Sequence, residues 1–203
     1  GKSEGIQLKL DLVDENDVKL DEIEIYTTCI ETVYGITFVV LAPEHSLVDK
    51  LADKIKNFDE VKAYKEKTAL KSEFDRISKV KDKSGCVLSG IYAINPITKS
   101  KVPVYLADFV LASYGTGAVM AVPTHDQRDY EFAEVFGIPK IQVIEGDVSK
   151  CAVEKAEYLA KNSKLINSGE FSGMPVKEAK KKIADMVVEK GLGKRQINYR
   201  MQD

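Results

Sequence analysis

The 203-residue sequence predicts an α+β fold in which a mixed, barrel-like β-sheet forms the core and helices lie at its periphery. Segments of strand and helix pattern are interspersed, but without the regular strand, helix, strand rhythm of a parallel α/β sheet. Hydrophobic residues make up 44% of the chain, which is enough for a sizeable core. No internal repeat and no linker rich in proline and glycine divides the chain. We therefore expect one domain that comprises residues 1–203.

The first half of the chain predicts a hairpin, a buried strand and several helices. Residues 6–12 and 23–27 alternate apolar and polar side chains, which is the period of half-buried strands. Residues 36–41 are a continuous apolar run typical of a buried strand, and apolar side chains recur at helical spacing over residues 47–55. Residues 58–83 are rich in lysine and glutamate, with apolar positions at helical spacing, so we expect one or two solvated helices there.

The second half of the chain combines further strands with two clear helices. Residues 126–136 begin with an acidic turn and end just before a glycine and a proline, as helices do. Residues 176–189 space their apolar side chains as a helix that Gly191 closes. The remaining strands are predicted at residues 85–94, 102–107, 117–122 and 141–144.

The charge and the cysteine content argue against some classes of function and indicate a cellular compartment. Thirty lysine and arginine residues against 32 aspartate and glutamate residues leave a net charge of -2, so no overall positive field indicates nucleic-acid binding. The three cysteines lack the C-x-x-C spacing of metal and redox sites, which fits a reducing cytoplasm. No apolar run reaches the roughly 20 residues of a membrane helix, and no targeting segment begins the chain. We expect an internal piece of a larger cytoplasmic protein without a membrane partner.

A first group of candidate site residues lies at the end of the predicted strand 23–27. Thr27, Thr28 and Thr32 leave this strand close together, and their hydroxyls can donate and accept hydrogen bonds in one pocket. Threonine is common at strand ends, so the cluster taken alone is explained better by chance than by function.

A second group follows the predicted strand 117–122, where polar residues stand at the start of a helix. Asp126 and Asp129 can cap this helix and complement its dipole; this is the simpler role for Asp126, whereas Asp129 suits capping and binding equally. His125 and the two aspartates lack the spaced partners of a metal site, so we expect no metal. The glycine-rich residues 115–117 lack the spacing of a phosphate loop, and the chain has no nucleophile elbow of a serine hydrolase.

The last predicted helix carries a run of four lysines. Such a run is more often a solvated helix face than a phosphate contact, and both interpretations stay open. The lysines are Lys177, Lys180, Lys181 and Lys182.

Long sequence blocks resemble the editing domain of bacterial leucyl-tRNA synthetase, known as connective polypeptide 1. The similarity lies in GTGAVMAVPTHDQRD, with IYAINPITKSKVPVYLADFVLASY before it and YEFAEVFGIP after it, and in TTCIETVYGITFVVLAPEH. The ends, GKSEG and INYRMQD, resemble the stretches that join this insert to the catalytic domain of a synthetase. The resemblance implies the editing-domain fold of class I aminoacyl-tRNA synthetases.

The resemblance also implies an activity and roles for the candidate residues. The family domain hydrolyses the ester between a wrong amino acid, chiefly norvaline or isoleucine, and the terminal adenosine of tRNA(Leu), and it spares leucyl-tRNA. By this resemblance Asp129 holds the α-ammonium group of the substrate, and Thr27 and Thr28 contact the reacting ester. The γ-methyl of Thr32 collides with leucine. Further pocket or border positions are Tyr114, Met120, Val122, His125 and Asp126, and Arg128 holds the loop or the acceptor end.

The same resemblance implies partners and cofactors. The editing step needs neither a metal nor an organic cofactor. The partners are the 3′ acceptor end of tRNA(Leu) and the remainder of a synthetase that joins leucine to tRNA(Leu) with ATP.

The threonine-rich block departs from the family pattern at three positions. Thr-Thr-Arg-Pro-Asp-Thr is usual, whereas Cys29, Ile30 and Glu31 stand between the threonines here. A thiol does not replace arginine in anion binding, so acceptor-end affinity is in question. We interpret the changes as tuning. The alternatives are a non-catalytic module that binds the tRNA acceptor end and, from the pocket chemistry alone, an amino-acid-binding domain without a role in RNA.

Overall fold

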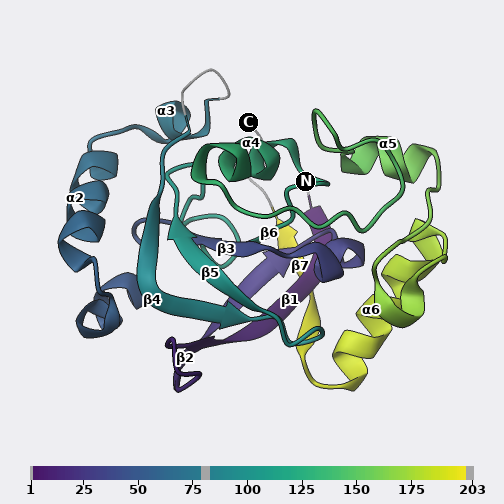
Figure 1. Cartoon of the computed structure of the whole chain (residues 1–203), viewed down its shortest axis with the longest axis horizontal. Coiled ribbons are helices and arrows are strands. Elements are labelled where there is room, and N and C mark those ends of the chain that lie inside the picture. Colours follow the sequence, from purple (N-terminus) through teal and green to yellow (C-terminus); the bar gives the residue numbers. More distant parts are fainter. Residues whose placement is uncertain (1, 79–82, 200–203) are drawn as a thin grey trace. The chain divides into compact units, whose positions relative to one another are not determined.

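A computed structural model of the chain describes residues 2–78 and 83–199, and its strands form one mixed, seven-stranded sheet (Figure 1). The strand order is β2-β1-β4-β5-β3-β6, with β7 also paired to β1. Strands β3 and β5 are parallel, whereas β4 pairs antiparallel with both β1 and β5. The strands are β1 (Lys2–Val13), β2 (Lys19–Thr27), β3 (Phe38–Leu41), β4 (Cys86–Ile94), β5 (Lys101–Leu106), β6 (Ala118–Ala121) and β7 (Gly193–Tyr199).

The predicted α+β class with a mixed sheet and peripheral helices is confirmed. The order ends at β2 on one side and at β6 on the other, so the sheet is open and the expected barrel-like closure is too strong a description. The α-helices are α1 (Ser46–Lys50), α2 (Phe58–Ala69), α3 (Glu73–Ile77), α4 (Gln127–Phe136), α5 (Lys155–Ala160) and α6 (Val176–Glu189). Short 3-10 helices are η1 (Ile30–Gly35), η2 (Ala52–Lys54) and η3 (Gly169–Phe171).

The predicted helices are found with local differences. Apolar spacing over residues 47–55 becomes α1 followed by η2, and residues 58–83 become α2 and α3. Residues 79–82 of that prediction lie outside the described residues. Strand 141–144 was predicted wrongly, because only an isolated bridge from Ile144 to Leu165 forms there. The backbone N–H groups of Val143 and Ile144 are used by a histidine side chain instead of a strand partner.

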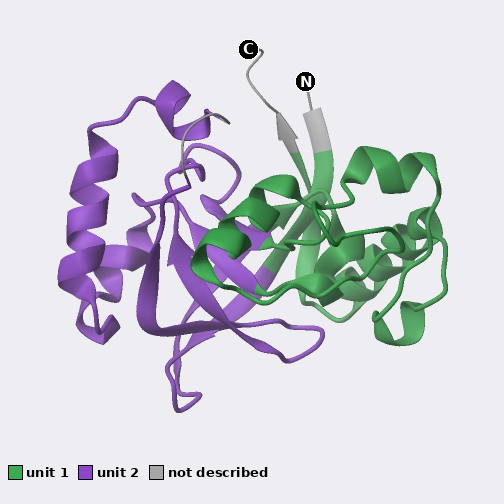
Figure 2. Ribbon diagram, turned by 45° about the horizontal axis from the view of Figure 1, so that its top comes forward, with its two compact units in different colours: residues 1–8, 26–37, 121–203 green, residues 9–25, 38–120 purple. Residues whose placement is uncertain are grey.

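The chain forms two compact units, each assembled from segments that alternate along the sequence (Figure 2). Unit 1 comprises residues 1–8, 26–37 and 121–203, and unit 2 comprises residues 9–25 and 38–120. The expectation of a single domain over residues 1–203 stays a prediction.

Unit 2 contains the central strands of the sheet and the helices α1 to α3. Strand β3 is completely buried, as its continuous apolar sequence predicts. Helix α2 packs beside β4 (Figure 1), where Asn57 joins the two elements. Its side-chain amide donates to the Val87 carbonyl at 2.8 Å and its oxygen accepts from the Ser89 N–H at 3.0 Å. Both polar ends of this side chain are therefore satisfied by the strand.

Unit 1 is organised around α6, which packs against η1 and β7. The buried face of α6 carries Val176, Ala179, Ile183 and Val187, all without exposed surface, at the three- and four-residue spacing of an amphipathic helix. Gly191 follows the helix with φ of +69°, a left-handed conformation that glycine adopts without the cost of a side chain. The chain then enters β7, which pairs antiparallel with the first residues of β1.

Candidate functional site

The threonine-rich segment leaves β2 at Thr27 and turns into η1. The Thr27 hydroxyl accepts a hydrogen bond of 2.9 Å from the Cys29 N–H, and the Thr32 hydroxyl donates one of 2.8 Å to the Cys29 carbonyl. Both threonines are buried. Two of the three predicted hydroxyls therefore hydrogen-bond to the backbone of the turn and stabilise it. The Thr32 hydroxyl is one of them, so the methyl group is the part of the Thr32 side chain that has no role in the turn.

Thr28 has a cationic neighbour that sequence analysis missed. The Lys155 ammonium lies 3.3 Å from the Thr28 hydroxyl oxygen and 3.3 Å from the Thr28 carbonyl oxygen. Lys155 opens α5, a helix that was not predicted, and it lies 127 positions away along the chain, so no local pattern signals this contact. A positive charge is thus held beside the hydroxyl that the family resemblance assigns to the reacting ester.

Cys29 and Glu31, two of the three departures from the family pattern, lie inside the same segment. Burial raises the pKa of the Cys29 thiol, so the neutral thiol, a weak nucleophile, is the form at neutral pH. Glu31 has no exposed surface, and its carboxylate accepts a 2.6 Å hydrogen bond from the Tyr158 hydroxyl. Burial and the nearby carboxylate raise the pKa of Tyr158, which keeps its phenol protonated as a donor.

The second segment begins after β6 and enters α4. The exposed Asp126 accepts a hydrogen bond of 3.0 Å from the Asp129 N–H, which confirms the predicted capping role of Asp126. Asp129 is only 7% exposed, and its carboxylate accepts a 3.0 Å bond from the Val122 N–H. A buried carboxylate held in this way provides a fixed negative charge at the start of α4.

The His125 side chain is hydrogen-bonded to the backbone of unit 1 through both of its ring nitrogens. Its Nδ1 atom lies 3.1 Å from the Val153 carbonyl, and its Nε2 atom accepts from the N–H groups of Val143 and Ile144 at 3.1 and 3.0 Å. These partners require the neutral ring with the proton on Nδ1. Burial lowers the pKa of His125 to about 4, in agreement with the neutral ring. Both ring nitrogens are therefore hydrogen-bonded to the protein backbone. His125 contributes to a site only indirectly, by fixing the backbone of residues 143, 144 and 153.

The two candidate segments are direct neighbours within unit 1. The Thr37 N–H donates to the Ala121 carbonyl at 3.1 Å. At Gly35 a Cβ atom would lie 2.9 Å from methyl carbons of both Val122 and Val143, so only glycine allows this approach. Residues 27–37 and 121–129, which sequence analysis selected separately, thus belong to one packed arrangement.

The remaining four predicted site residues are divided between the two units. Arg128 is half-buried on α4 in unit 1, and Val122 is buried beside Gly35. Tyr114, half exposed, and Met120, buried in β6, belong to unit 2. Their proposed pocket roles stay predictions.

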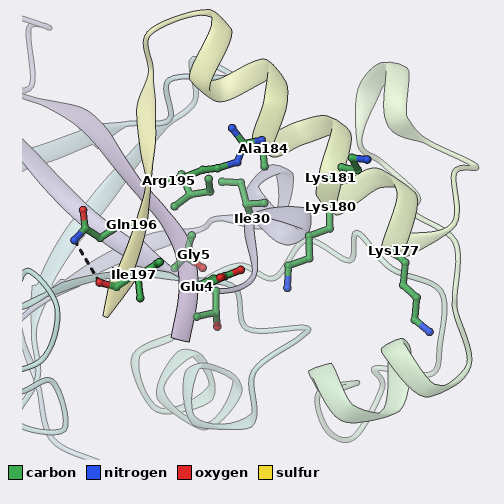
Figure 3. A pocket seen from close by; sticks show the side chains of 13 residues that line it. Glu4, Gly5, Ile30, Lys177, Lys180, Lys181, Ala184, Arg195, Gln196 and Ile197 are labelled. Atoms are coloured by element: carbon green, nitrogen blue, oxygen red, sulfur yellow. Dashed lines mark hydrogen bonds between the residues drawn. The ribbon is translucent and has the colours of Figure 1, made fainter. Parts of the chain in front are cut away.

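A pocket of about 490 Å³ lies entirely within unit 1, between β1, β7, α6 and the threonine-rich segment (Figure 3). Of the predicted site residues, only Thr27 and Thr28 line it. Four lysine and arginine residues and one glutamate are among its lining residues. Its lining residues are Glu4, Gly5, Ile6, Thr27, Thr28, Ile30, Lys177, Lys180, Lys181, Ala184, Arg195, Gln196 and Ile197.

Two searches of the described residues bear on the classes of function. Residues 2–78 and 83–199 contain no group of three or more histidine, cysteine, aspartate and glutamate side chains arranged to hold a metal ion. In the same ranges no helix combines the length and the apolar character needed to cross a membrane.

Comparison with known proteins identifies the family. Residues 1–188 match the sequence model described as "Leucyl-tRNA synthetase, editing domain". The chain belongs to this family. The family resemblance expected from the blocks at residues 27–45 and 91–139 is thereby confirmed for this editing domain.

Two relatives give the extent of the similarity. A leucine–tRNA ligase of Alkaliphilus oremlandii (strain OhILAs) is 43% identical to the editing domain over 204 residues, which are 100% of this chain and 24% of that protein. The crystal structure of the ternary complex of Agrobacterium radiobacter K84 agnB2 LeuRS, tRNA and LeuAMS aligns with a TM-score of 0.71 and 29% identity. That alignment covers 100% of this chain and 21% of the solved one. The editing domain thus spans about a quarter of the length of the relatives it matches.

Proposed function

We propose that residues 1–203 are the editing module of a leucine–tRNA ligase, and that this module hydrolyses the ester of tRNA(Leu) carrying norvaline or isoleucine while it spares leucyl-tRNA. The observation that carries the proposal is that Thr27, Thr28, Thr32 and Asp129 all belong to one compact unit of a chain in this family. The proposal includes the tRNA acceptor end and the rest of a cytoplasmic, ATP-dependent synthetase as partners.

Editing is needed because a single binding pocket discriminates poorly between amino acids that differ by one methyl group. One missing or displaced methyl group changes binding in an apolar pocket by only about 1–3 kcal/mol. A second site that rejects the correct product and hydrolyses the wrong ones removes the remaining errors. The Thr32 methyl group is suited to this rejection, because its hydroxyl is already bound to the Cys29 carbonyl. Leucine would collide with that methyl group, whereas the unbranched norvaline would not.

Asp129 is suited to anchor the substrate. Its carboxylate is buried and oriented by the Val122 N–H, and a charge-assisted hydrogen bond to an α-ammonium group is strong in such a place. We assign the amino end of the aminoacyl group to this residue.

Hydrolysis proceeds by direct attack of water without a covalent intermediate. The Cys29 thiol is protonated and the His125 nitrogens are occupied, so neither side chain serves as nucleophile or base. Thr28 and Lys155 place a hydroxyl and a positive charge together, where they can stabilise the negative charge that develops on the ester oxygen. The step needs neither a metal nor an organic cofactor.

The test is deacylation of isoleucyl- and norvalyl-tRNA(Leu) by the full-length synthetase that carries this module. Asp129→Ala should abolish turnover with the circular dichroism spectrum unchanged. Thr32→Ala should gain hydrolysis of leucyl-tRNA(Leu), and Thr32→Val, which keeps a branched side chain, should still spare leucine. Binding of the acceptor end with no turnover by the unaltered enzyme would overturn the hydrolase proposal in favour of a non-catalytic binding module.

A further inference from the structure

The Arg76 guanidinium of α3 lies inside unit 2, where only 8% of the residue is exposed. Its Nη1 and Nη2 atoms donate to the two carboxylate oxygens of Glu44 at 2.9 and 2.8 Å, which makes a bidentate pair. Its Nε atom donates to the Asp108 carbonyl at 2.8 Å, and Nη2 donates also to the Val110 carbonyl at 3.0 Å. One side chain thus joins α3 to the segments that follow β3 and β5.

The segment after β5 is held at two further points by α2 and the turn that follows it. The Asp108 N–H donates to the Tyr64 hydroxyl at 2.9 Å. The buried Asp108 carboxylate pairs with the Lys71 ammonium at 2.9 Å. The charges of Arg76 and Lys71 therefore offset those of Glu44 and Asp108. A neutral, hydrogen-bonded cluster of this kind fixes the backbone in place and does not attract a charged ligand.

Tyr114 stands in a tight turn, residues 111–117, that lies between β5 and β6. Its N–H donates to the Leu111 carbonyl at 3.1 Å, and its carbonyl accepts from the Gly117 N–H at 2.9 Å. Gly117 has a φ of +72°, which suits glycine, and its carbonyl accepts from the Ala42 N–H at 2.8 Å. The Tyr114 side chain is half exposed. An ordered turn therefore presents a partly exposed aromatic ring, as loops that bind ligands do.

Arg76 acts on both ends of the Tyr114 turn. Val110, whose carbonyl it binds, is the residue directly before the turn. Glu44, its bidentate partner, lies two positions after Ala42, whose N–H holds the other end of the turn. Loss of the guanidinium would weaken both anchors at once. An aromatic ring on a mobile turn binds less tightly, because ordering the turn costs free energy on binding.

We propose that Arg76 is a positioning residue for the editing reaction, one that orients the Tyr114 ring for contact with the substrate and does not touch the substrate itself. The proposal rests on the proposed function and on the pocket role that the family resemblance implies for Tyr114. Lysine would not replace this arginine, because one ammonium group cannot span both carboxylate oxygens and two carbonyls. The partners of Arg76 lie 32 and 34 positions away along the chain, so no local pattern signals the role.

The first experiment is a double-variant cycle on deacylation of isoleucyl-tRNA(Leu) by the full-length synthetase that carries this chain. Arg76→Lys should raise KM about threefold and leave kcat within about twofold, because the groups assigned to the reacting ester are unchanged. Tyr114→Ala should raise KM about tenfold, the range expected when an aromatic side chain that contacts a base is removed. In the Tyr114→Ala background Arg76→Lys should have no further effect on KM, since the side chain through which it acts is gone.

Asn57→Ala is the matched control for a loss of stability in the same unit. Asn57 also binds two backbone groups of unit 2, but these are the Val87 carbonyl and the Ser89 N–H of β4. Urea unfolding should show that this variant, like Arg76→Lys, is destabilised. Its KM and kcat should nevertheless stay within about twofold of the unaltered enzyme, because its contacts do not include the Tyr114 turn.

A second readout does not depend on hydrolysis. The 203-residue chain contains no tryptophan, so Tyr114→Trp introduces one fluorescent indole into the turn. Time-resolved fluorescence anisotropy measures the fast local motion of this indole. The amplitude of that motion should increase when Arg76→Lys is added and should stay unchanged when Asn57→Ala is added. Circular dichroism checks that each variant folds.

Three results would overturn the inference. Independent KM increases from Arg76→Lys and Tyr114→Ala that multiply in the double variant would show that Arg76 does not act through Tyr114. An equal KM increase from Asn57→Ala would show a general effect of stability. Unchanged motion of the indole on addition of Arg76→Lys would show that the turn is ordered without the guanidinium. Absence of turnover by the unaltered enzyme would refute the proposed activity, and the anisotropy would still decide whether Arg76 orders the turn.

Discussion

The rings of His125 and Tyr158 meet edge to face, with their centroids 6.0 Å apart and their planes at 89°. Each ring also holds a different part of unit 1. His125 binds the backbone of residues 143, 144 and 153, and Tyr158 binds Glu31 in the threonine-rich segment. One aromatic contact therefore connects the supports of both candidate segments, and edge-to-face pairs of this kind are stabilising.

Tyr158→Phe should lower the free energy of unfolding by about 2 kcal/mol, because it leaves the buried Glu31 carboxylate without its donor. The ring contact with His125 is retained, so the effect reports the hydroxyl alone. Urea unfolding monitored by circular dichroism measures it. Tyr34→Phe is the control, since the Tyr34 hydroxyl makes no hydrogen bond within residues 2–78 and 83–199, and this change should cost less than about 0.5 kcal/mol. Equal losses would argue against a specific role of the Tyr158 hydroxyl.

His125 should make stability depend on pH. Its pKa is about 4 in the folded chain against 6.5 for the ordinary group, so the folded state binds its proton less tightly than the unfolded state does. The stabilisation is fully present above pH 6.5 and is lost as the pH falls toward 4, by on the order of 3 kcal/mol in total. Urea unfolding between pH 4 and 8 checks this. The His125→Asn variant, which cannot titrate, should lose that part of the slope; an identical pH profile would contradict the assignment.

Lys155→Met should reduce kcat/KM for deacylation of isoleucyl-tRNA(Leu) by about tenfold, equal to about 1.4 kcal/mol. The reason is the loss of the ammonium group beside the Thr28 hydroxyl. Lys161→Met is the control, because Lys161 ends the same helix and pairs with Glu157. Similar activity of the two variants would show that the charge beside Thr28 does not act on the reaction.

Gly35→Ala should destabilise the chain by about 1–3 kcal/mol, the usual cost of forcing a methyl group into a filled interior. The new Cβ atom would lie 2.9 Å from methyl carbons of Val122 and Val143. Val143→Ala in the same chain should recover part of the loss by making room. Thermal unfolding of the single and double variants measures the coupling, and strictly additive losses would contradict direct contact.

Periodicity along the chain predicted most strands and helices because the relevant neighbours lie a few residues apart. The apolar spacing of α6 and the buried run of β3 are of this kind. Strand β7 was missed, because its sequence Gly193–Tyr199 has few apolar residues and becomes a strand only beside β1. The strand predicted at residues 141–144 does not form, although the apolar side chains of this segment are typical of a strand. The N–H groups of Val143 and Ile144 are bound by the His125 side chain.

The sequence by itself determined the α+β class, the cap at Asp126, the family, and the two segments that carry the candidate site. Only the tertiary structure decided that His125 is a buried support, that Lys155 meets Thr28 across 127 positions, and that lysines of α6 share a pocket with Thr27 and Thr28. The physical reason is the range of the interactions. Periodicity and capping depend on residues within one or two turns, whereas these contacts exist only after distant segments have packed together.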